Sequence, residues 1–167
     1  MQNQNDESQP NPSMSNVGQK AVTIAQSKLG MKEEGGQNQG PIVKWSMKPW
    51  SKAEVGAWAQ WCAAFVCTCL YEAGSFQIKK LASTNVKTLW KNCEKSKLTW
   101  QCYNTPTQRI PIPGDIVFFQ NLGHVGLCEK VEGTVVYTIE GNFGDQVRRD
   151  HHDISEGHFH GFAHLTS

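Results

Sequence analysis

The chain has 167 residues, of which 38% are hydrophobic and 19% are charged. This length predicts one domain, and this apolar share supports one sizeable core, so a wholly disordered chain is excluded. The formal net charge of +1 gives no overall attraction to nucleic acid or to an acidic membrane, and we expect neither as a partner. Six cysteines are too few for a disulfide-stapled miniprotein and do not by themselves establish disulfides.

Residues 1–16 predict a disordered tail, because they are rich in Gln, Asn, Ser and Pro and contain no aromatic residue. They lack the basic start and the apolar core of a classical signal peptide. The longest apolar run, residues 61–71, is too short to span a bilayer. We therefore expect a protein that is made in the cytoplasm and has a single domain over residues 17–167.

Three helices are predicted in the first hundred residues. Residues 17–29 keep one face apolar at helical spacing, with Asn16 as a candidate N-cap. The same reasoning predicts helices from near Cys62 to Gly74 and over residues 84–93. Short strands joined by tight turns follow, at residues 116–119, 124–130, 134–140 and near 160–165. Helices followed by such strands indicate an α+β fold with an antiparallel sheet.

Cys62 stands at the start of a predicted apolar helix. Unpaired backbone N–H groups and the positive end of the helix dipole stabilise a thiolate in such a position and make it a nucleophile. A buried core thiol is the alternative interpretation, since that is the commoner fate of a cysteine. The other five cysteines lack such a position or a usable partner spacing, and we interpret them as structural: Cys67, Cys69, Cys93, Cys102 and Cys128.

His124 lies at the start of a predicted strand, and the hairpin that follows suggests its partner. A three-residue loop over residues 131–133 places glycine at the left-handed last position and sets His124 directly opposite Glu140. A two-residue loop over residues 132–133 would send Glu140 to the other face. We favour the three-residue loop, because a carboxylate fixes the tautomer of an imidazole and stabilises its charged form.

These residues can form one site. Gly126 leaves a bare patch of strand beside His124, where the N-terminus of the helix at Cys62 has room to approach. The order would be thiol, imidazole and orienting carboxylate. Asn142 lies two residues beyond Glu140, on the same face if the strand continues, and is a second candidate for the orienting group. An ordinary cross-strand His–Glu pair is the alternative interpretation.

Four segments in this order resemble the CHAP family (cysteine, histidine-dependent amidohydrolase/peptidase) of peptidoglycan hydrolases. They are residues 61–66 (WCAAFV), 113–119 (PGDIVFF), 123–127 (GHVGL) and 140–142 (EGN). The resemblance covers roughly residues 17–165. It implies a papain-like fold, with N-terminal helices packed on a central antiparallel sheet, and a peptidoglycan substrate.

The resemblance implies that Cys62 is the nucleophile, His124 the general base and Glu140 the group that orients the histidine. Asn142 matches a position that often assists. The reaction would be hydrolysis of an amide bond through a thioacyl-enzyme, with the backbone N–H of Cys62 holding the oxyanion. Whether the enzyme is an amidase or an endopeptidase stays open.

Further candidates surround these residues. Gln60 is a candidate second donor to the oxyanion, and Trp61 and Asn38 are candidates for the substrate groove. Glu34, like Asn38, falls where related sequences carry similar residues. Asp115 matches a recurrent family position, but we interpret it as a turn-capping residue.

No cofactor is expected. Some phage lysins of the family carry an Asp-rich calcium loop just before the cysteine, whereas residues 48–60 hold a single carboxylate here. Since calcium takes six to eight oxygen ligands, we expect no calcium site. Two alternative functions stay open: an inactive CHAP-like binding module, and a metal-binding protein. The second would use the C-terminal histidines: His151, His152, His158, His160 and His164. Of these, His158 and His160 could hold a transition metal, whereas residues 151–152 predict a solvated loop.

The predicted domain takes up nearly all of the chain, which leaves no room for a separate wall-binding module. A net charge of +1 supplies little attraction to an anionic wall. We therefore expect an enzyme that other machinery brings to the cell wall. It would be an antibacterial secretion-system effector, with a cognate immunity protein as partner, or a phage lysin released when the host lyses.

Overall fold

The computed structural model describes residues 16–50, 60–102 and 109–165. The expected tail, except Asn16, and most of the stretch before Cys62 lie outside the described residues. The helices are α1 (Asn16–Ser27), α2 (Pro41–Met47), α3 (Cys62–Glu72), α4 (Ile78–Leu81) and α5 (Val86–Lys95). The strands are β1 (Thr99–Gln101), β2 (Ile116–Phe119), β3 (Val125–Glu132), β4 (Val135–Glu140), β5 (Arg148–Asp153) and β6 (Phe159–Ala163), with 3-10 turns η1 (Gln120–Leu122) and η2 (Ile154–Glu156).

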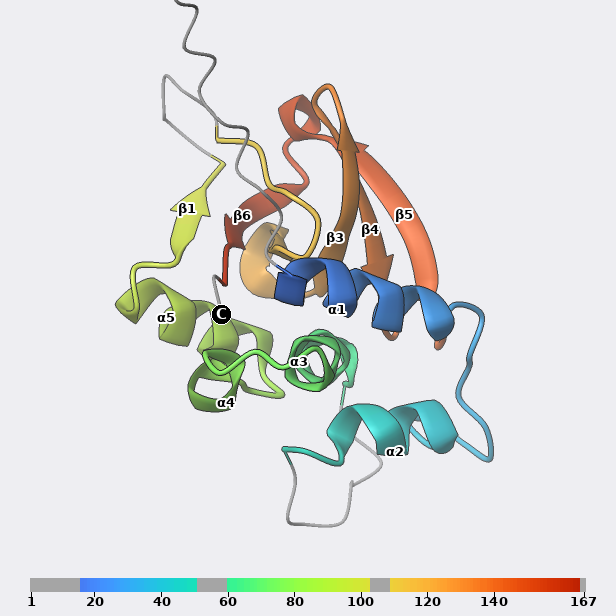
Figure 1. Ribbon diagram of the computed structural model, residues 1–167. Helices are drawn as coiled ribbons and strands as arrows, with labels where there is room; N and C mark the ends of the chain where they lie inside the picture. The colour runs from blue at the N-terminus through green and yellow to red at the C-terminus, as the bar shows by residue number, and fades with distance from the viewer. Residues whose placement is uncertain (1–15, 51–59, 103–108, 166–167) are drawn as a thin grey trace, which may run out of the picture.

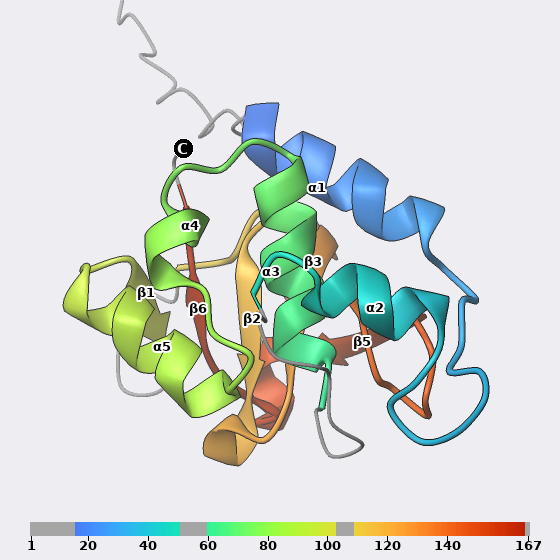
Figure 2. The same cartoon turned by 90° about the horizontal axis from the view of Figure 1, so that it is seen from below.

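The strands form one sheet in the order β1-β6-β2-β3-β4-β5, and every neighbouring pair is antiparallel. The helices gather on one side of this sheet, as Figures 1 and 2 show from two directions. The predicted α+β class and its antiparallel sheet are therefore confirmed. Among the described residues, none of the helices has the length and apolar character that crossing a bilayer requires.

Helix α3 is the centre of the core. All residues from Cys62 to Leu70 are buried, as expected for a helix that is apolar on every side. It packs against α1 and α2 and against the sheet at β3 and β4. A smaller apolar cluster covers the other face of the sheet, because successive side chains of a strand point to opposite faces. In β2, Phe118 thus belongs to the main core and Val117 to the smaller cluster.

The elements with a clear apolar period form where we predicted them, whereas shorter or more polar ones were missed. Helices α1, α3 and α5 and strands β2, β3, β4 and β6 match the predictions to within a few residues. Asn16 is the first residue of α1 rather than part of a tail. The expectation that residues 151–152 form a loop is wrong, since they pair with Tyr137 and Val136 as part of β5. Strand β5 is made of charged and histidine residues, so it has no apolar alternation to reveal it.

The predicted three-residue hairpin loop is also wrong. Glu132 pairs with Val135, so that the loop contains two residues, Gly133 and Thr134. The pairing then shifts by one at Glu129, where a bulge lies between Cys128 and Lys130. A bulge of this kind moves every later side chain to the opposite face relative to its partner strand.

Candidate active site

His124 and Glu140 touch each other, but through a register that differs from the prediction. Beyond the bulge, Leu127 pairs with Ile139, which places Gly126 rather than His124 across from Glu140. Without the bulge, Glu140 would face Leu127 and lie on the opposite side of the sheet from His124. The extra residue at Glu129 therefore brings the two side chains to one face.

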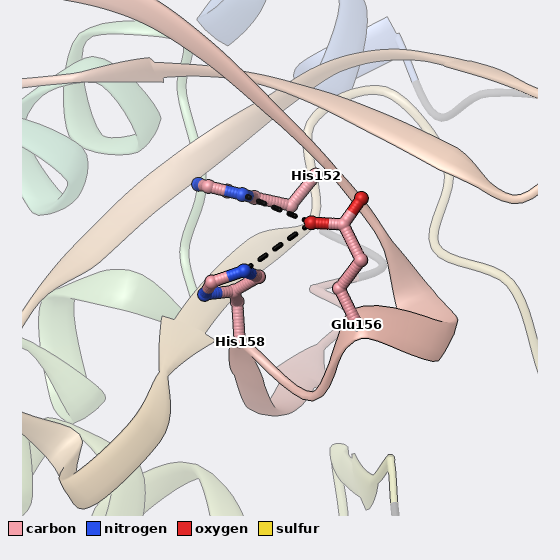
Figure 3. Close-up of side chains that lie close together, drawn as sticks. All are labelled: His152, Glu156 and His158. Carbon is pink, nitrogen blue, oxygen red and sulfur yellow. Dashed lines mark ion pairs between the residues drawn. The ribbon is translucent and has the colours of Figure 1, made fainter.

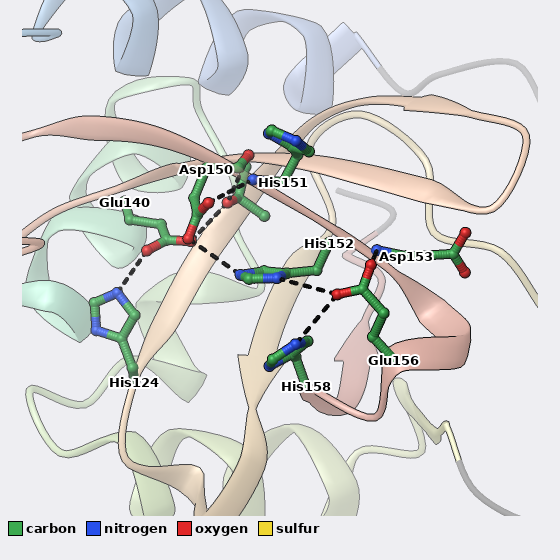
Figure 4. A network of polar contacts seen from close by, with 9 residues as sticks. His124, Glu140, Asp150, His151, His152, Asp153, Glu156 and His158 are labelled. Atoms are coloured by element: carbon green, nitrogen blue, oxygen red, sulfur yellow. Dashed lines mark hydrogen bonds and ion pairs between the residues drawn. The ribbon is translucent and has the colours of Figure 1, made fainter.

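Gly126 makes the contact between His124 and Glu140 possible, although these two residues are not directly opposite each other on the paired strands. A Cβ atom at this position would lie only 2.8 Å from Cγ of Glu140, so the carboxylate side chain occupies the space above the glycine. From there Glu140 reaches His124, whose Nε2 donates a 2.9 Å hydrogen bond to Oε2 (Figure 4). The predicted contact between the two residues is present, although the space at Gly126 holds Glu140 and not a helix.

The second oxygen of Glu140 has its own donor. Oγ1 of Thr138 lies 2.6 Å from Oε1 of Glu140 and 3.4 Å from the carbonyl oxygen of Asp150. A hydroxyl has one proton to give, so the shorter contact is the one to which Thr138 donates. Glu140 is only 1% exposed, and a buried carboxylate needs such partners at both oxygens. Sequence reasoning missed Thr138, although its place two residues before Glu140 puts it on the same face of β4.

Cys62 is the first residue of α3, as predicted. The N-cap residue Trp61 gives no side-chain hydrogen bond to the helix start, and the N–H groups of a first turn have no acceptor within their own helix. These groups and the helix dipole favour a negative charge at the sulfur of Cys62.

The helix start comes close to the sheet at Gly141. A Cβ atom there would lie 2.6 Å from Cβ of Phe65 and 2.9 Å from Cζ3 of Trp61, so only glycine allows this approach. The approach brings Cys62 close enough to His124 for the thiol to help raise the pKa of the imidazole. Sequence reasoning placed the approach at Gly126, one strand away from where it occurs.

His124 thus lies between a thiol and a carboxylate. Burial lowers the pKa of its imidazole, but the hydrogen bonds with Cys62 and Glu140 and the charges of these two groups outweigh burial and raise the pKa to about 9. Since Nε2 is bonded to Glu140, Nδ1 is the ring nitrogen that faces Cys62. The ring therefore carries its proton at neutral pH and can give it up through Nδ1.

The other cysteines have different surroundings. Burial raises the pKa of Cys67 and Cys93 to about 12 and that of Cys102 to about 11. Burial also raises the pKa of Cys69 and Cys128. These five thiols are therefore neutral at physiological pH, in agreement with the structural role that we predicted for them.

A cavity of about 480 Å³ opens beside Cys62. Its lining joins three parts of the chain: the start of α3, the start of α5 and the turn between β2 and β3. The lining residues are Gln60, Cys62, Thr84, Asn85, Val86, Lys87, Leu122 and Gly123. Gln60 was among the predicted site residues. Residues 84–87 were missed, because no motif marks them and they meet Cys62 only through the packing of α5.

Trp61 and Asn38, both predicted for the groove, lie elsewhere. Trp61 is fully buried, and its Nε1 donates a 2.8 Å hydrogen bond to Oε1 of Glu33. Asn38 is also buried and lines a different cavity together with Glu34; its backbone N–H donates to Oε2 of Glu33 at 2.8 Å. Glu33, which the sequence did not single out, thus ties the loop before α2 to the start of α3.

Asn142 does not extend the strand of Glu140. Strand β4 ends at Glu140, and Asn142 lies in the following turn with a φ of 57°. The strand thus does not continue to Asn142, and the condition for its side chain to share a face with Glu140 is not met.

Asp115 has the turn contact that we predicted. Its Oδ2 accepts a 2.9 Å hydrogen bond from the backbone N–H of Ile112. Its Oδ1 also contacts Nδ1 of His164 at 2.5 Å, which makes a second histidine–carboxylate pair.

Comparison with known proteins places the site within a known domain. The family model described as CHAP domain matches residues 51–142, just over half of the chain, and this range contains Cys62, His124 and Glu140. No curated protein matches the chain. Among solved structures, the crystal structure of Ly7917 is similar with 14% identity and a TM-score of 0.40, over 89% of this chain and 62% of that one. The chain thus spans less than two thirds of that protein's length, and the likeness is too distant to bear on the site.

Proposed function

The chain belongs to the CHAP family, a papain-like family of amidases and peptidases that act on peptidoglycan, and we propose that Cys62, His124 and Glu140 hydrolyse an amide bond of that substrate. One observation carries the proposal: His124 lies between the Cys62 thiol, which helps to raise the pKa of the imidazole, and the buried Glu140 carboxylate, to which its Nε2 donates a hydrogen bond. This is the arrangement of an activated nucleophile, its base and the group that orients the base.

The first half of the reaction uses the proton held on His124. The Cys62 thiolate attacks the carbonyl carbon of the substrate and forms a C–S bond. Nδ1 of His124 gives its proton to the amide nitrogen as the C–N bond breaks, so the amine leaves neutral. A thioacyl-enzyme and a neutral imidazole remain. Glu140 keeps its charge throughout and holds Nε2.

The second half restores the enzyme. Nδ1 of His124 accepts a proton from water, whose oxygen attacks the thioester carbon. The C–S bond breaks, the carboxylic product leaves, and Cys62 returns as a thiolate beside the imidazolium.

The negative charge on the carbonyl oxygen needs donors near the start of α3. We assign the backbone N–H of Cys62 as one donor, and Gln60, which lines the same cavity, as the candidate for the second. One such donor typically lowers the barrier by about 3–4 kcal/mol.

Digestion of purified peptidoglycan, followed by mass spectrometry of the released fragments, tests this function. We expect wild type to release fragments and Cys62→Ala to release none, while Cys128→Ala, which removes a buried thiol, stays active. The fragment masses distinguish an amidase from an endopeptidase. Equal digestion by wild type and Cys62→Ala would contradict the mechanism. Binding of peptidoglycan without any release by wild type would instead indicate an inactive binding module.

We further propose that this hydrolase reaches the wall through other machinery, as an antibacterial effector or a phage lysin. The low net charge supports this, because it gives little attraction to an anionic wall. Expression in bacteria with and without a fused export signal tests the proposal: lysis should require export and an intact Cys62. Suppression of lysis by a co-expressed immunity protein from the same locus would identify an effector. Lysis without the signal would contradict the need for delivery.

A further inference from the structure

A second cluster of titratable side chains lies at the C-terminal end of β5. His152 comes from β5, Glu156 from η2, and His158 from the residues just before β6. Oε2 of Glu156 lies 3.9 Å from Nδ1 of His152 and 3.2 Å from Nε2 of His158 (Figure 3). One nitrogen or oxygen atom from each side chain lies within 4.8 Å of the other two.

We propose that these three side chains bind one divalent transition-metal ion, such as zinc, through Nδ1 of His152, Oε2 of Glu156 and Nε2 of His158. Zinc binds imidazole nitrogen and carboxylate oxygen at about 2.0–2.2 Å, so two of its tetrahedral ligands lie roughly 3.3–3.5 Å apart. The distances from Glu156 to the two histidines lie on either side of this range. Two imidazoles and one carboxylate suit zinc, copper or nickel better than calcium or magnesium.

His152 is already oriented for such an ion. Its Nε2 lies 3.1 Å from Oδ2 of Asp150, which leaves Nδ1 directed at Glu156 (Figure 4). A carboxylate behind a histidine in this way fixes the ring and increases its basicity, as it does at many zinc sites. The rings of Phe119 and Phe159 meet that of His152 nearly edge-on, each with its centroid 6.0 Å away, and they hold it further.

The backbone around η2 positions the other two ligands. Asp153 caps this turn by accepting the N–H of Ser155 at 2.9 Å, and Oε1 of Glu156 accepts the N–H of Asp153 at 3.3 Å. The two oxygens of Glu156 therefore differ: Oε1 holds the turn, and Oε2 faces the histidines. Gly157, with a left-handed φ of 75°, then reverses the chain so that His158 lies beside His152. Their ring centroids are 4.3 Å apart.

The cluster is open to solvent, and none of its three side chains lines the cavity beside Cys62. Glu156 and His158 are each about half exposed, so an ion can enter and water can complete its coordination. The remaining C-terminal histidines have other partners: the ring of His151 stacks on Tyr137, His164 pairs with Asp115, and the ring of His160 packs edge-on against Trp90. The metal site therefore uses two of the five histidines that the sequence offered.

Calorimetric titration of the metal-free protein with zinc chloride tests the proposal. Cys62→Ala serves as the parent protein, so that the thiol beside His124 cannot bind zinc. We expect one zinc ion per chain, with affinity reduced at least about tenfold by His158→Ala and by Glu156→Gln. His151→Ala removes the neighbouring histidine of β5 and should bind like the parent.

Two further readouts keep the result interpretable. Zinc at a hundred times its dissociation constant should raise the melting temperature of the parent by roughly 5–10 °C and leave that of His158→Ala nearly unchanged. X-ray absorption should show nitrogen and oxygen ligands near 2.0–2.1 Å and no sulfur near 2.3 Å. No binding, sulfur ligands, or equal affinity in His158→Ala and His151→Ala would overturn the proposal. Peptidoglycan digestion by His158→Ala in the otherwise wild-type chain should persist, which separates this result from a failure of the proposed hydrolase.

Discussion

Two histidine–carboxylate pairs in this molecule have nearly the same geometry but different surroundings. In one pair, Nε2 of His124 lies 2.9 Å from Oε2 of Glu140; in the other, Nδ1 of His164 lies 2.5 Å from Oδ1 of Asp115. In the first pair the histidine side chain is 26% exposed and the carboxylate 1%, and in the second pair these values are 20% and 2%. Neither distance nor burial therefore separates the pair that we propose as catalytic from the other pair.

The cysteine beside each pair makes the difference. Cys62 begins a helix, lies beside His124, whose pKa it helps to raise, and lines a cavity. Cys128 lies in the middle of β3, where burial and then the charge of Asp115 raise its pKa. A carboxylate next to a histidine thus does not define a site by itself. The comparison instead indicates that the environment of the thiol decides which pair can support nucleophilic catalysis.

Replacing the two histidines in turn should separate the pairs most strongly. His124→Ala removes the base and the proton donor, so we expect kcat/KM to fall by roughly 10³-fold or more. His164→Ala should leave kcat/KM within about threefold of wild type while lowering the free energy of unfolding by about 1–3 kcal/mol, because the buried Asp115 loses a hydrogen-bond partner. Rates of peptidoglycan digestion and chemical denaturation measure both effects. Equal losses of activity would remove the distinction.

The carboxylates should show the same contrast at a smaller scale. In Glu140→Gln, we expect kcat/KM to fall by roughly tenfold to a hundredfold, because the amide orients the ring but no longer stabilises its charge. Asp115→Asn should change stability and not kcat/KM. A Glu140→Gln enzyme as active as wild type would show that Glu140 does not act through His124.

The pH profile tests the charge on His124. Its pKa of about 9 predicts that kcat/KM falls as the pH rises through about 9, where the imidazolium loses its proton. In Glu140→Gln, this fall in kcat/KM, the alkaline limb of the pH profile, should move to lower pH, since Glu140 helps to raise the pKa of His124. Stability should follow the same sign: because the pKa is higher in the folded protein, the stabilisation is complete below about 6.5 and is lost as the pH rises toward 9. Asp115→Asn should leave the limb of kcat/KM in place, and a limb that does not respond to Glu140→Gln would contradict the assignment.

Thr138→Val should have the smallest effect. It keeps the shape of the side chain but removes the donor to Oε1 of Glu140, so we expect kcat/KM to fall by less than about tenfold and stability by about 1–3 kcal/mol. Thr134→Val, which removes a hydroxyl bonded to Asp153 at the exposed hairpin turn, is the matched control and should keep full activity. A loss of stability in Thr138→Val with no change in activity or in the alkaline limb would reduce Thr138 to a packing role.

Much of the fold was predictable because apolar residues recur with the period of the structure that they form. In helix α3, the same pattern predicts both the fold and part of the site: an apolar run that begins at Cys62 indicates a buried helix with a thiol at its start. The contact of His124 with Glu140 was predictable as well, since a short hairpin joins them. The register was not, because the bulge at Glu129 leaves no mark in the hydropathy pattern.

Features that depend on packing between distant segments could not be predicted. The close approach at Gly141 depends on how α3 lies against β4, and the role of Glu33 depends on where the indole of Trp61 lies. Strand β5 lies at the edge of the sheet and carries polar residues on both sides, so no alternation reveals it. The pairing of His158 with His152 rather than with His160 follows from this strand and could not be predicted without it.

Of the six cysteines, we expect Cys62 alone to be activated, and we expect His124 to activate it. Alkylation with less than one equivalent of iodoacetamide at pH 6, followed by peptide mapping, tests this most directly. We expect Cys62 to be modified first in wild type and in His164→Ala, and we expect this preference to disappear in His124→Ala. Modification of another cysteine first, or an equal rate at Cys62 with and without His124, would contradict it.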